Sequence, residues 1–257
     1  MKVWNKKLNK KLNKKNKLMI FLAITLIILI ILLISLTIAI NTDHMNHSTI
    51  AKAKNLGINS LGSAYLEGPY GNINSSDKIA FIVGVHPLES NSHISLLSYL
   101  RNNSKNLNKS YYIYIINVTK DKDDFDKGRM NGQLLGRDYV VPDINSKNYT
   151  FVVDIHSHRD AYIESNFIIS PLNDLESKKI GSSIIKSIED MKILKYIPAD
   201  DGHPTSPEYI SIPILKNGTP NIIYETSLNE EKNVTDYFIK NFIENLDKVD
   251  FKKINFQ

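Results

Sequence analysis

The sequence has 257 residues, a net charge of +5 and no cysteine. The absence of cysteine excludes disulfide bonds, thiolate metal ligands and thiol nucleophiles. Residues 1–17 contain eight lysines and no acidic residue, so the rest of the chain is close to neutral or slightly acidic. A basic segment confined to one end indicates contact with a membrane surface, and we expect no nucleic acid partner.

A membrane anchor is the first predicted element. Residues 18–40 contain no charged side chain and are dominated by Leu and Ile. As a helix this run would be ~34 Å long, against a bilayer core of ~30 Å. The lysines of the basic segment predict a cytoplasmic N-terminus, an outward-facing C-terminal domain and contact with membrane lipids. We therefore expect a single-pass protein of the cell membrane.

A cleaved signal peptide is the alternative to a retained anchor, because Thr37-Ile38-Ala39 resembles a small-residue cleavage site. The apolar core of such a peptide is usually about 7 to 15 residues long, and the run here is much longer, which favours the anchor. Residues 41–60 are mixed and polar, and predict a tether. Residues 61–257 are numerous enough for one domain with its own core.

Within this domain, apolar runs alternate with segments of helical spacing. The runs predict strands at 78–85, 111–118, 149–155, 167–170, 209–215 and 221–226. The spacing predicts helices at 90–101, with Ile94, Leu97 and Leu100 on one face, at 172–191, and at 230–249, with Tyr237, Phe238, Phe242 and Leu246 on one face. Such alternation predicts an α/β fold in which a mixed, mainly parallel sheet lies between helices.

Polar side chains follow several of the predicted strands, at the edge of the sheet where ligands bind in α/β folds. His86 and Glu89 follow the first strand as an H-x-x-E pair. One more histidine would complete the three-ligand set of a catalytic zinc site. Glu225 follows the last apolar strand, where burial would raise its pKa toward that of a useful general base.

The third metal ligand has alternatives. Asp154, His156 and His158 alternate along one predicted strand, and residues two apart in a strand share a face. This spacing leaves both His156 and His158 open as ligands. Asp154 is expected to support the site from behind the ligands.

These motifs resemble those of the zinc carboxypeptidase superfamily, which includes the succinylglutamate desuccinylase and aspartoacylase branch. The similarity extends from Phe81 to Ser227 and rests on His86-x-x-Glu89, on Ile155-His156-Ser157-His158 and on Glu225 at the end of a late strand. The resemblance selects His156 as the third Zn²⁺ ligand beside His86 and Glu89. It also implies that Glu225 is the general base.

The resemblance further implies two catalytic arginines. Arg129-Met130-Asn131-Gly132 leads to Gly136-Arg137-Asp138-Tyr139, where the family has an Arg-x-Asn stretch followed by Asn-Arg and an aromatic residue. Arg129 is expected to stabilise the oxyanion and Arg137 to bind a substrate carboxylate, although the two roles are interchangeable at this stage.

Further substrate contacts are expected from Asn131, from His158 and from His203, which lies in a Gly/Pro-rich loop similar to the mobile substrate loop of the family. Two positions depart from the family pattern. Gly136 replaces the usual asparagine, and His158 stands where carboxypeptidases tend to have tyrosine. These departures leave carboxypeptidase specificity open.

The resemblance thus implies a zinc-dependent hydrolase that cleaves an amide bond, and the outward orientation favours extracellular or cell-wall peptides. A deacylase of N-acyl amino acids is the alternative that the short domain favours. A surface binding module without catalysis is a third possibility. The same ligands also bind other divalent ions, and the sequence does not predict the oligomeric state.

Overall fold

The structure, a computed structural model, describes Met19, Leu22 and residues 24–32, 53–159, 161–198 and 205–254. The chain divides into two units, Met1–Thr49 and Ile50–Gln257. The described residues of the first unit are helical and exposed. No helix in the described ranges has the length and apolar character needed to cross a membrane. The basic segment, much of the predicted anchor and most of the predicted tether lie outside the described residues.

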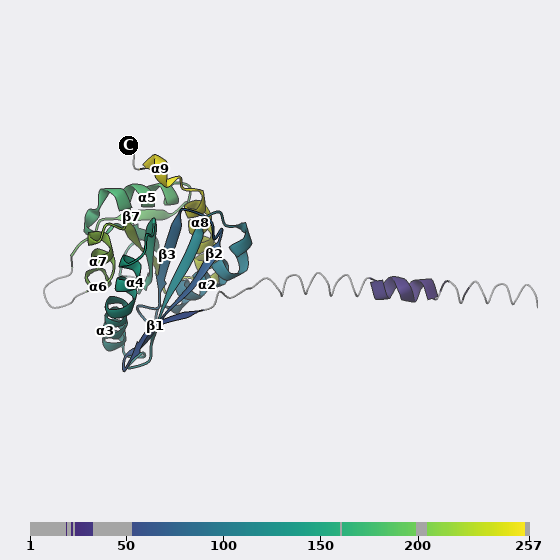
Figure 1. The fold of residues 1–257 in the computed structure, drawn as a ribbon, viewed down its shortest axis with the longest axis horizontal. Coiled ribbons are helices and arrows are strands. Elements are labelled where there is room, and N and C mark those ends of the chain that lie inside the picture. Colours follow the sequence, from purple (N-terminus) through teal and green to yellow (C-terminus); the bar gives the residue numbers. More distant parts are fainter. Residues whose placement is uncertain are drawn as a thin grey trace, which may run out of the picture. The chain divides into compact units, whose positions relative to one another are not determined.

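Within its described residues, the second unit is built on an eight-stranded mixed sheet (Figure 1). The strands are β1 (Lys54–Asn59), β2 (Gly62–Gly71), β3 (Lys78–Val83), β4 (Ser110–Val118), β5 (Phe151–His158), β6 (Asn166–Ile169), β7 (Met191–Leu194) and β8 (Asn221–Ser227). Their spatial order is β1-β2-β4-β3-β5-β8-β6-β7. The four central strands, β4, β3, β5 and β8, run parallel, and β2 and β6 flank them in the antiparallel direction.

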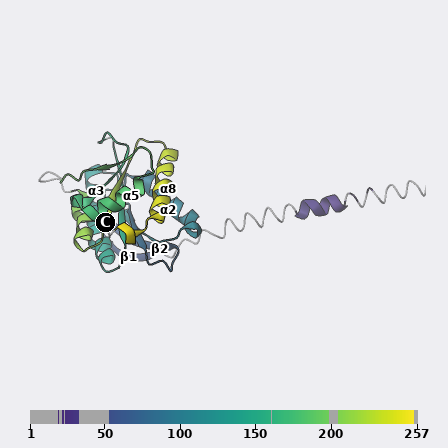
Figure 2. The ribbon, with the colours of Figure 1, turned by 90° about the horizontal axis from the view of Figure 1, so that it is seen from above.

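Helices cover both faces of this sheet. One face packs against α2 (Ser90–Asn103), α5 (Leu175–Ile185), α8 (Lys232–Lys248) and α9 (Phe251–Ile254). The other face packs against α3 (Phe125–Leu135), the π-helical turn η2 (Gly136–Val140), α4 (Val141–Asn145) and α7 (Ser211–Lys216). In Figure 2, α2 and α8 lie together on the side opposite to α3. Short helical segments complete the described chain: η1 (Ser104–Asn106), η3 (Pro171–Asn173) and α6 (Ser206–Tyr209).

The central strands are apolar on both faces. In β3, Ile79 and Phe81 belong to the core on the α2 and α8 side, whereas Ala80 and Ile82 belong to the core on the α3 side. A strand that is buried on both faces has a nearly continuous apolar sequence, which is why these strands are visible in the sequence. The predicted mixed α/β fold is confirmed, and β3, β4, β5, β6 and β8 coincide with five predicted strands.

The predicted strand at 209–215 is wrong, because this segment contains the end of α6 and most of α7. Thr205 and Glu208 form a capping box, and a proline lies in the first turn, so the local sequence starts a helix. Ile210 and Ile214 then pack on the sheet, four residues apart. A short buried apolar run has the same appearance in a helix and in a strand, so periodicity could not separate them.

Other boundaries also differ from the prediction. The helix predicted at 172–191 ends at Ile185, and Asp190, with a φ of 62°, turns the chain into β7. Residues 54–59 form β1 instead of continuing the tether, because they pair with β2, a strand that was not predicted. In α2, Leu100 is buried as expected, but Ile94 is 51% exposed, since His93 and Leu96 form the buried face.

Candidate active site

Three side chains from two neighbouring strands converge at the carboxyl end of the sheet. His86 and Glu89 lie in the turn between β3 and α2, and His156 lies near the end of β5, which pairs in parallel with β3. Their ligand atoms lie within 4.8 Å of one another, and all three residues are buried. Nδ1 of His156 is 3.0 Å from Glu89 Oε2 and 3.0 Å from His86 Nδ1. Nδ1 of His86 is 2.8 Å from Glu89 Oε1.

The turn that carries His86 requires a glycine. Gly84 follows β3 with a φ of +83°, and a Cβ at this position would lie 2.1 Å from the carbonyl oxygen of Ile116. Only glycine adopts such a conformation readily and leaves room for the neighbouring backbone. The chain therefore leaves the sheet sharply at this point, which brings His86 beside the end of β5.

Burial and mutual charge set the protonation of the three residues. Burial lowers the pKa of His86 to about 4, so its imidazole is neutral. Burial alone would raise the pKa of Glu89, but His86 and His156 hold it well below its usual value. Burial alone would lower the pKa of His156, but the carboxylates of Asp154 and Glu89 raise it well above its usual value. The cluster is thus a carboxylate between a neutral and a protonated imidazole.

This donor set fits zinc. Two imidazole nitrogens and one carboxylate are the protein ligands of one class of catalytic zinc site, which keeps a further position open. The proton that His156 carries must leave when a metal binds, which couples metal affinity to pH. The positive charge of a metal ion would replace that proton beside Glu89.

Further polar groups contact the Nε2 atoms of the two histidines, on the side of each ring that faces away from Glu89. Asp154 Oδ1 is 3.1 Å from His156 Nε2, and Ser206 Oγ is 3.2 Å from the same nitrogen. Gln133 Nε2 is 3.4 Å from His86 Nε2, while Gln133 Oε1 is buried without a hydrogen-bond partner in the described part of the chain. A Gln133 amide turned by 180° would accept a hydrogen bond from His86 Nε2, which leaves Nδ1 free to bind a metal.

Glu225 lies beside this cluster. It is near the end of β8, opposite His156 in the parallel pairing of β5 with β8. Its Oε2 atom is buried and, among the described residues, has no hydrogen-bond partner. Burial raises the pKa of the Glu225 carboxyl group to about 8. This value suits a group that takes up and returns a proton near neutral pH.

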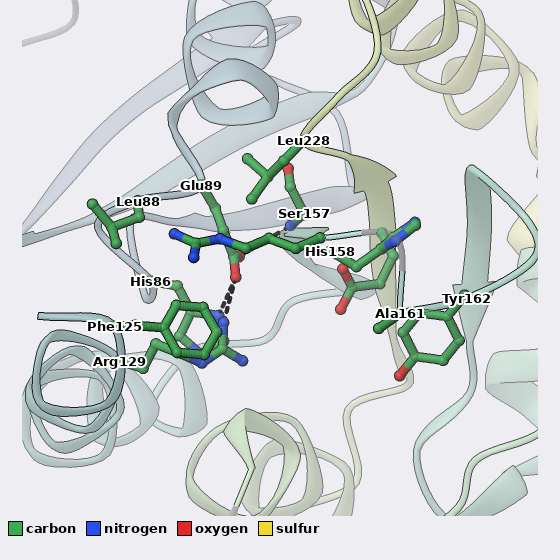
Figure 3. Close-up of a pocket in the computed structure, with 12 residues that line it drawn as sticks. His86, Leu88, Glu89, Phe125, Arg129, Ser157, His158, Ala161, Tyr162 and Leu228 are labelled. Atoms are coloured by element: carbon green, nitrogen blue, oxygen red, sulfur yellow. Dashed lines mark hydrogen bonds and ion pairs between the residues drawn. The ribbon is translucent and has the colours of Figure 1, made fainter.

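Two cavities meet at the cluster, one of about 350 Å³ and one of about 180 Å³. They share His86, Arg129, Tyr162 and Glu225. Figure 3 shows the larger cavity, with Glu89 and His86 facing Arg129, and with Phe125 and Tyr162 in its walls. A substrate that spans both cavities would pass Glu225.

Arg129 reaches the cluster from α3. Its Nη1 atom donates a hydrogen bond to Glu89 Oε1 at 2.6 Å. The close approach of α3 depends on Gly132, because a Cβ at this position would lie 1.7 Å from the carbonyl oxygen of Val85. The predicted placement of Arg129 beside the metal ligands therefore agrees with the structure.

Arg137 and Asn131 lie elsewhere. The Arg137 side chain is 51% exposed, pairs with Asp138 at 2.7 Å and lines neither cavity. It follows Gly136, the buried first residue of η2, whose backbone packs closely against the Ile210 side chain. Asn131 donates a hydrogen bond to the carbonyl oxygen of Lys120 and lines neither cavity. The structure thus does not bring these two residues into the site.

The two predicted histidines outside the ligand set have different outcomes. His158 lines the larger cavity, where its ring lies 5.3 Å from both Tyr162 and Phe167 and its Nε2 is 3.2 Å from the carbonyl oxygen of Ser165. It is therefore a wall residue, and His156 is the histidine within the cluster. His203 lies outside the described residues.

No family model matches the sequence, and no curated protein matches it. Solved structures do match. A metallo-carboxypeptidase from Burkholderia cenocepacia has a TM-score of 0.53 and 12% identity over 77% of this chain and 64% of that chain. The chain has the fold of a metallo-carboxypeptidase. The predicted resemblance to the zinc carboxypeptidase superfamily is therefore confirmed at the level of the fold.

Two further structures share this metallo-carboxypeptidase fold. A candidate carboxypeptidase A from Shewanella denitrificans has a TM-score of 0.55 and 16% identity over 82% of this chain and 68% of that chain. The cell shape determinant protein Csd4 from Helicobacter pylori has a TM-score of 0.50 and 11% identity over 76% of this chain and 55% of that chain. The chain spans less than two thirds of the length of the Burkholderia protein and of Csd4.

Among the residues that line the cavities and were not predicted are Phe125, Arg159 and Tyr162. Arg159 follows His158 directly, so its position at the end of β5 was a usable signal. Phe125 and Tyr162 come from segments whose place beside the site depends on the fold. Ser206 lies at the end of the Gly/Pro-rich stretch at 201–207 in which the sequence predicts a substrate loop.

Proposed function

We propose that the protein is a membrane-anchored, zinc-dependent hydrolase that cleaves an amide bond. The observation that carries this proposal is the carboxyl group of Glu225, whose Oε2 atom is buried, which lines the same two cavities as His86 and opposes His156 across neighbouring strands. A binding module would have no use for a proton acceptor in this position. Hydrolysis requires one.

His86, Glu89 and His156 would hold the ion, since their ligand atoms converge within the cluster. Bound zinc lowers the pKa of water and polarises a carbonyl group. Glu225 takes the proton of the attacking water on its carboxylate and then donates it to the nitrogen of the leaving amine. Arg129 supplies a fixed positive charge beside the carbonyl oxygen, where negative charge develops during the reaction.

The proposed location rests on the N-terminal sequence. The uncharged run at 18–40 anchors the chain, and the lysines of residues 1–17 keep the N-terminus in the cytoplasm. The catalytic domain then works on the outer side of the membrane. Extracellular or cell-wall peptides are accordingly the proposed substrates.

A second candidate activity is the deacylation of N-acyl amino acids. The observation that favours it is the position of Arg137, which the family pattern assigns to a substrate carboxylate but which pairs with Asp138 and lines neither cavity. The same side chains would serve this reaction, because it also cleaves an amide bond. The two activities differ in whether a peptide or a free acyl acid is released.

The test uses the full chain, purified in detergent and loaded with Zn²⁺. N-blocked peptides and N-acyl amino acids are offered, and the products are identified by mass spectrometry. We expect one stoichiometric zinc ion and hydrolysis by the wild type. Glu225→Gln should lower kcat by about 10²- to 10⁴-fold at unchanged zinc content, whereas Glu189→Gln on the exposed surface should change neither.

Two results would count against a hydrolase. One is a zinc-loaded wild type that cleaves no member of either substrate class. The other is a Glu225→Gln variant with full activity, which would show that the proton acceptor is elsewhere.

A further inference from the structure

The strand β5, which carries His156, extends past its neighbour β3. The parallel pairing of the two strands ends at Ile82 and Asp154, and β3 itself ends at Val83, whereas β5 continues to His158. Buried backbone N–H and C=O groups do not stay unpaired, so the end of β5 needs other partners on this side. Because His156 lies in this part of the strand, those partners also affect the position of a metal ligand.

Two side chains from the start of α2 take the place of the missing strand. His93, in the first turn of α2, has its Nε2 atom 3.0 Å from the carbonyl oxygen of Ile155. Glu89, the residue before α2, accepts a hydrogen bond from the backbone N–H of Ser157 at 3.0 Å (Figure 3). Ile155 and Ser157 directly precede and follow His156 in the chain. The backbone on both sides of this ligand is therefore bonded to the start of α2.

The proton of His93 decides which contact its ring makes. Burial lowers the pKa of His93, so the imidazole is neutral and has a single N–H. Its Nε2 atom is also 3.4 Å from the backbone nitrogen of Gly84, which is a donor. One nitrogen cannot donate to Ile155 and accept from Gly84 at the same time, and the shorter distance favours donation to Ile155. In this tautomer the imidazole bonds to the end of β5 at the point where the chain after β3 leaves the sheet.

A chain of hydroxyl groups adds a second connection between α2 and the strand ends. Ser92 Oγ is 2.9 Å from Ser157 Oγ, which is 2.8 Å from Thr226 Oγ1, and all three residues are buried. Ser157 directly follows His156 in β5, and Thr226 directly follows Glu225 in β8. The hydroxyl chain therefore joins α2 to both strands that supply side chains to the site.

We propose that His93 is a positioning residue of the metal site, which holds the end of β5 so that His156 stays within reach of the ion that His86 and Glu89 bind. This inference rests on the proposed function, because it takes these three residues as zinc ligands. His93 lines neither of the two cavities and is not one of the three clustered residues. Its effect therefore passes through the backbone of β5.

Loss of the His93 donor should move this strand end. A buried carbonyl oxygen without a partner is unfavourable, so the Ile155 carbonyl would turn toward water or toward another donor. His156 follows Ile155 directly and would move with it. Zinc holds an imidazole nitrogen at about 2.0–2.1 Å, so a small displacement of His156 is sufficient to weaken binding.

The test measures zinc affinity by chelator competition on the purified full chain, which requires no turnover. His93→Leu, which keeps much of the bulk and lacks the donor, should lower zinc affinity by about 10- to 100-fold. His93→Gln, which supplies an amide N–H, should restore part of this loss. Leu100→Ala is the matched control, because Leu100 is buried about two turns further along the same helix. It should lower the urea midpoint and leave zinc affinity unchanged.

The inference is overturned if His93→Leu binds zinc as tightly as the wild type. It is also overturned if Leu100→Ala loses as much affinity, because zinc binding would then follow stability alone. If His93→Leu does not fold, NMR of the wild type labelled with ¹⁵N-histidine gives the answer. The His93 proton should lie on Nε2 and exchange slowly with water, and a proton on Nδ1 would refute the contact with Ile155. Failure of the hydrolase proposal is separable, since a wild type that binds zinc and cleaves no substrate can still show the His93-dependent affinity.

Discussion

Asp154 Oδ1 lies 3.1 Å from Nε2 of His156, while Nδ1 of the same ring faces Glu89 at 3.0 Å. The imidazole is therefore held between two carboxylates, one on each nitrogen. The contact with Asp154 fixes the orientation of the ring and strengthens Nδ1 as a donor toward a metal. Ser206 and Ser211 each place a hydroxyl oxygen near Asp154 Oδ2, at 3.3 and 3.2 Å, which keeps this carboxylate in position.

Substitution of Asp154 should weaken metal binding without removing a ligand. We expect Asp154→Asn to lower zinc affinity by about 10- to 100-fold, because His156 loses its negatively charged partner. A chelator competition assay measures the affinity, and circular dichroism checks the fold. Asp250→Asn, which changes an exposed carboxylate far along the chain, is the control. Unchanged affinity in Asp154→Asn would show that Asp154 does not support the ligand.

Zinc binding at neutral pH should release protons. His156 carries a proton in the metal-free protein because Asp154 and Glu89 raise its pKa, and that proton must leave Nδ1 when the metal binds. Calorimetric titration of zinc in buffers of different ionisation enthalpy gives the number released. Asp154→Asn should release fewer protons, since a lower pKa leaves His156 less protonated beforehand. Equal release by the two proteins would contradict this account.

Glu225 should make the metal-free protein less stable at high pH. Burial raises its pKa from 4.5 to about 8, so between these values the folded state holds a proton that the unfolded state has lost. The proton on Glu225 therefore stabilises the folded state fully below pH 4.5, the pKa of the group in the unfolded chain. This stabilisation is lost as the pH rises through about 8, the pKa in the folded protein. The unfolding midpoint of wild type should therefore fall relative to that of Glu225→Gln as pH increases from about 5 to about 8.5. A constant difference across this range would mean that the Glu225 pKa is not raised.

The sequence pointed to His86, Glu89 and Glu225 because each stands at or just beyond the end of a strand that is apolar on both faces, whereas the choice of His156 over His158 came from the family resemblance. Such strands are recognisable locally, and parallel neighbours bring their carboxyl ends together. β1 and β2 were not predicted, because their sequences lack this apolar character on both faces. The edge strand β1 is largely exposed, and β2 contains three glycines and a proline, so neither has the continuous apolar run of a central strand.

The arginines show the limit of motif matching. Arg137 occupies the position that the family pattern assigns to a substrate contact, but in η2 the Arg137 side chain is half exposed and pairs with Asp138. Arg159 directly follows β5, but its guanidinium group lies against the ring of Phe125, which comes from α3 and is distant in sequence. Contacts of this kind depend on tertiary structure, and no local pattern contains them.

The position of α3 provides a final prediction, based on two glycines that differ in what surrounds them. A Cβ at Gly132 would meet the backbone oxygen of Val85 at 1.7 Å, and backbone cannot move aside without shifting the turn that carries His86. A Cβ at Gly136 would meet the Cδ1 atom of Ile210 at 2.5 Å, the flexible end of a side chain.

We expect Gly132→Ala to destabilise the protein by about 1–3 kcal/mol or more and to weaken zinc binding, because α3 is pushed away from His86. Gly136→Ala should cost less and leave zinc binding unchanged. Urea denaturation and chelator competition measure the two effects, and similar losses in both variants would contradict the proposed role of this close approach.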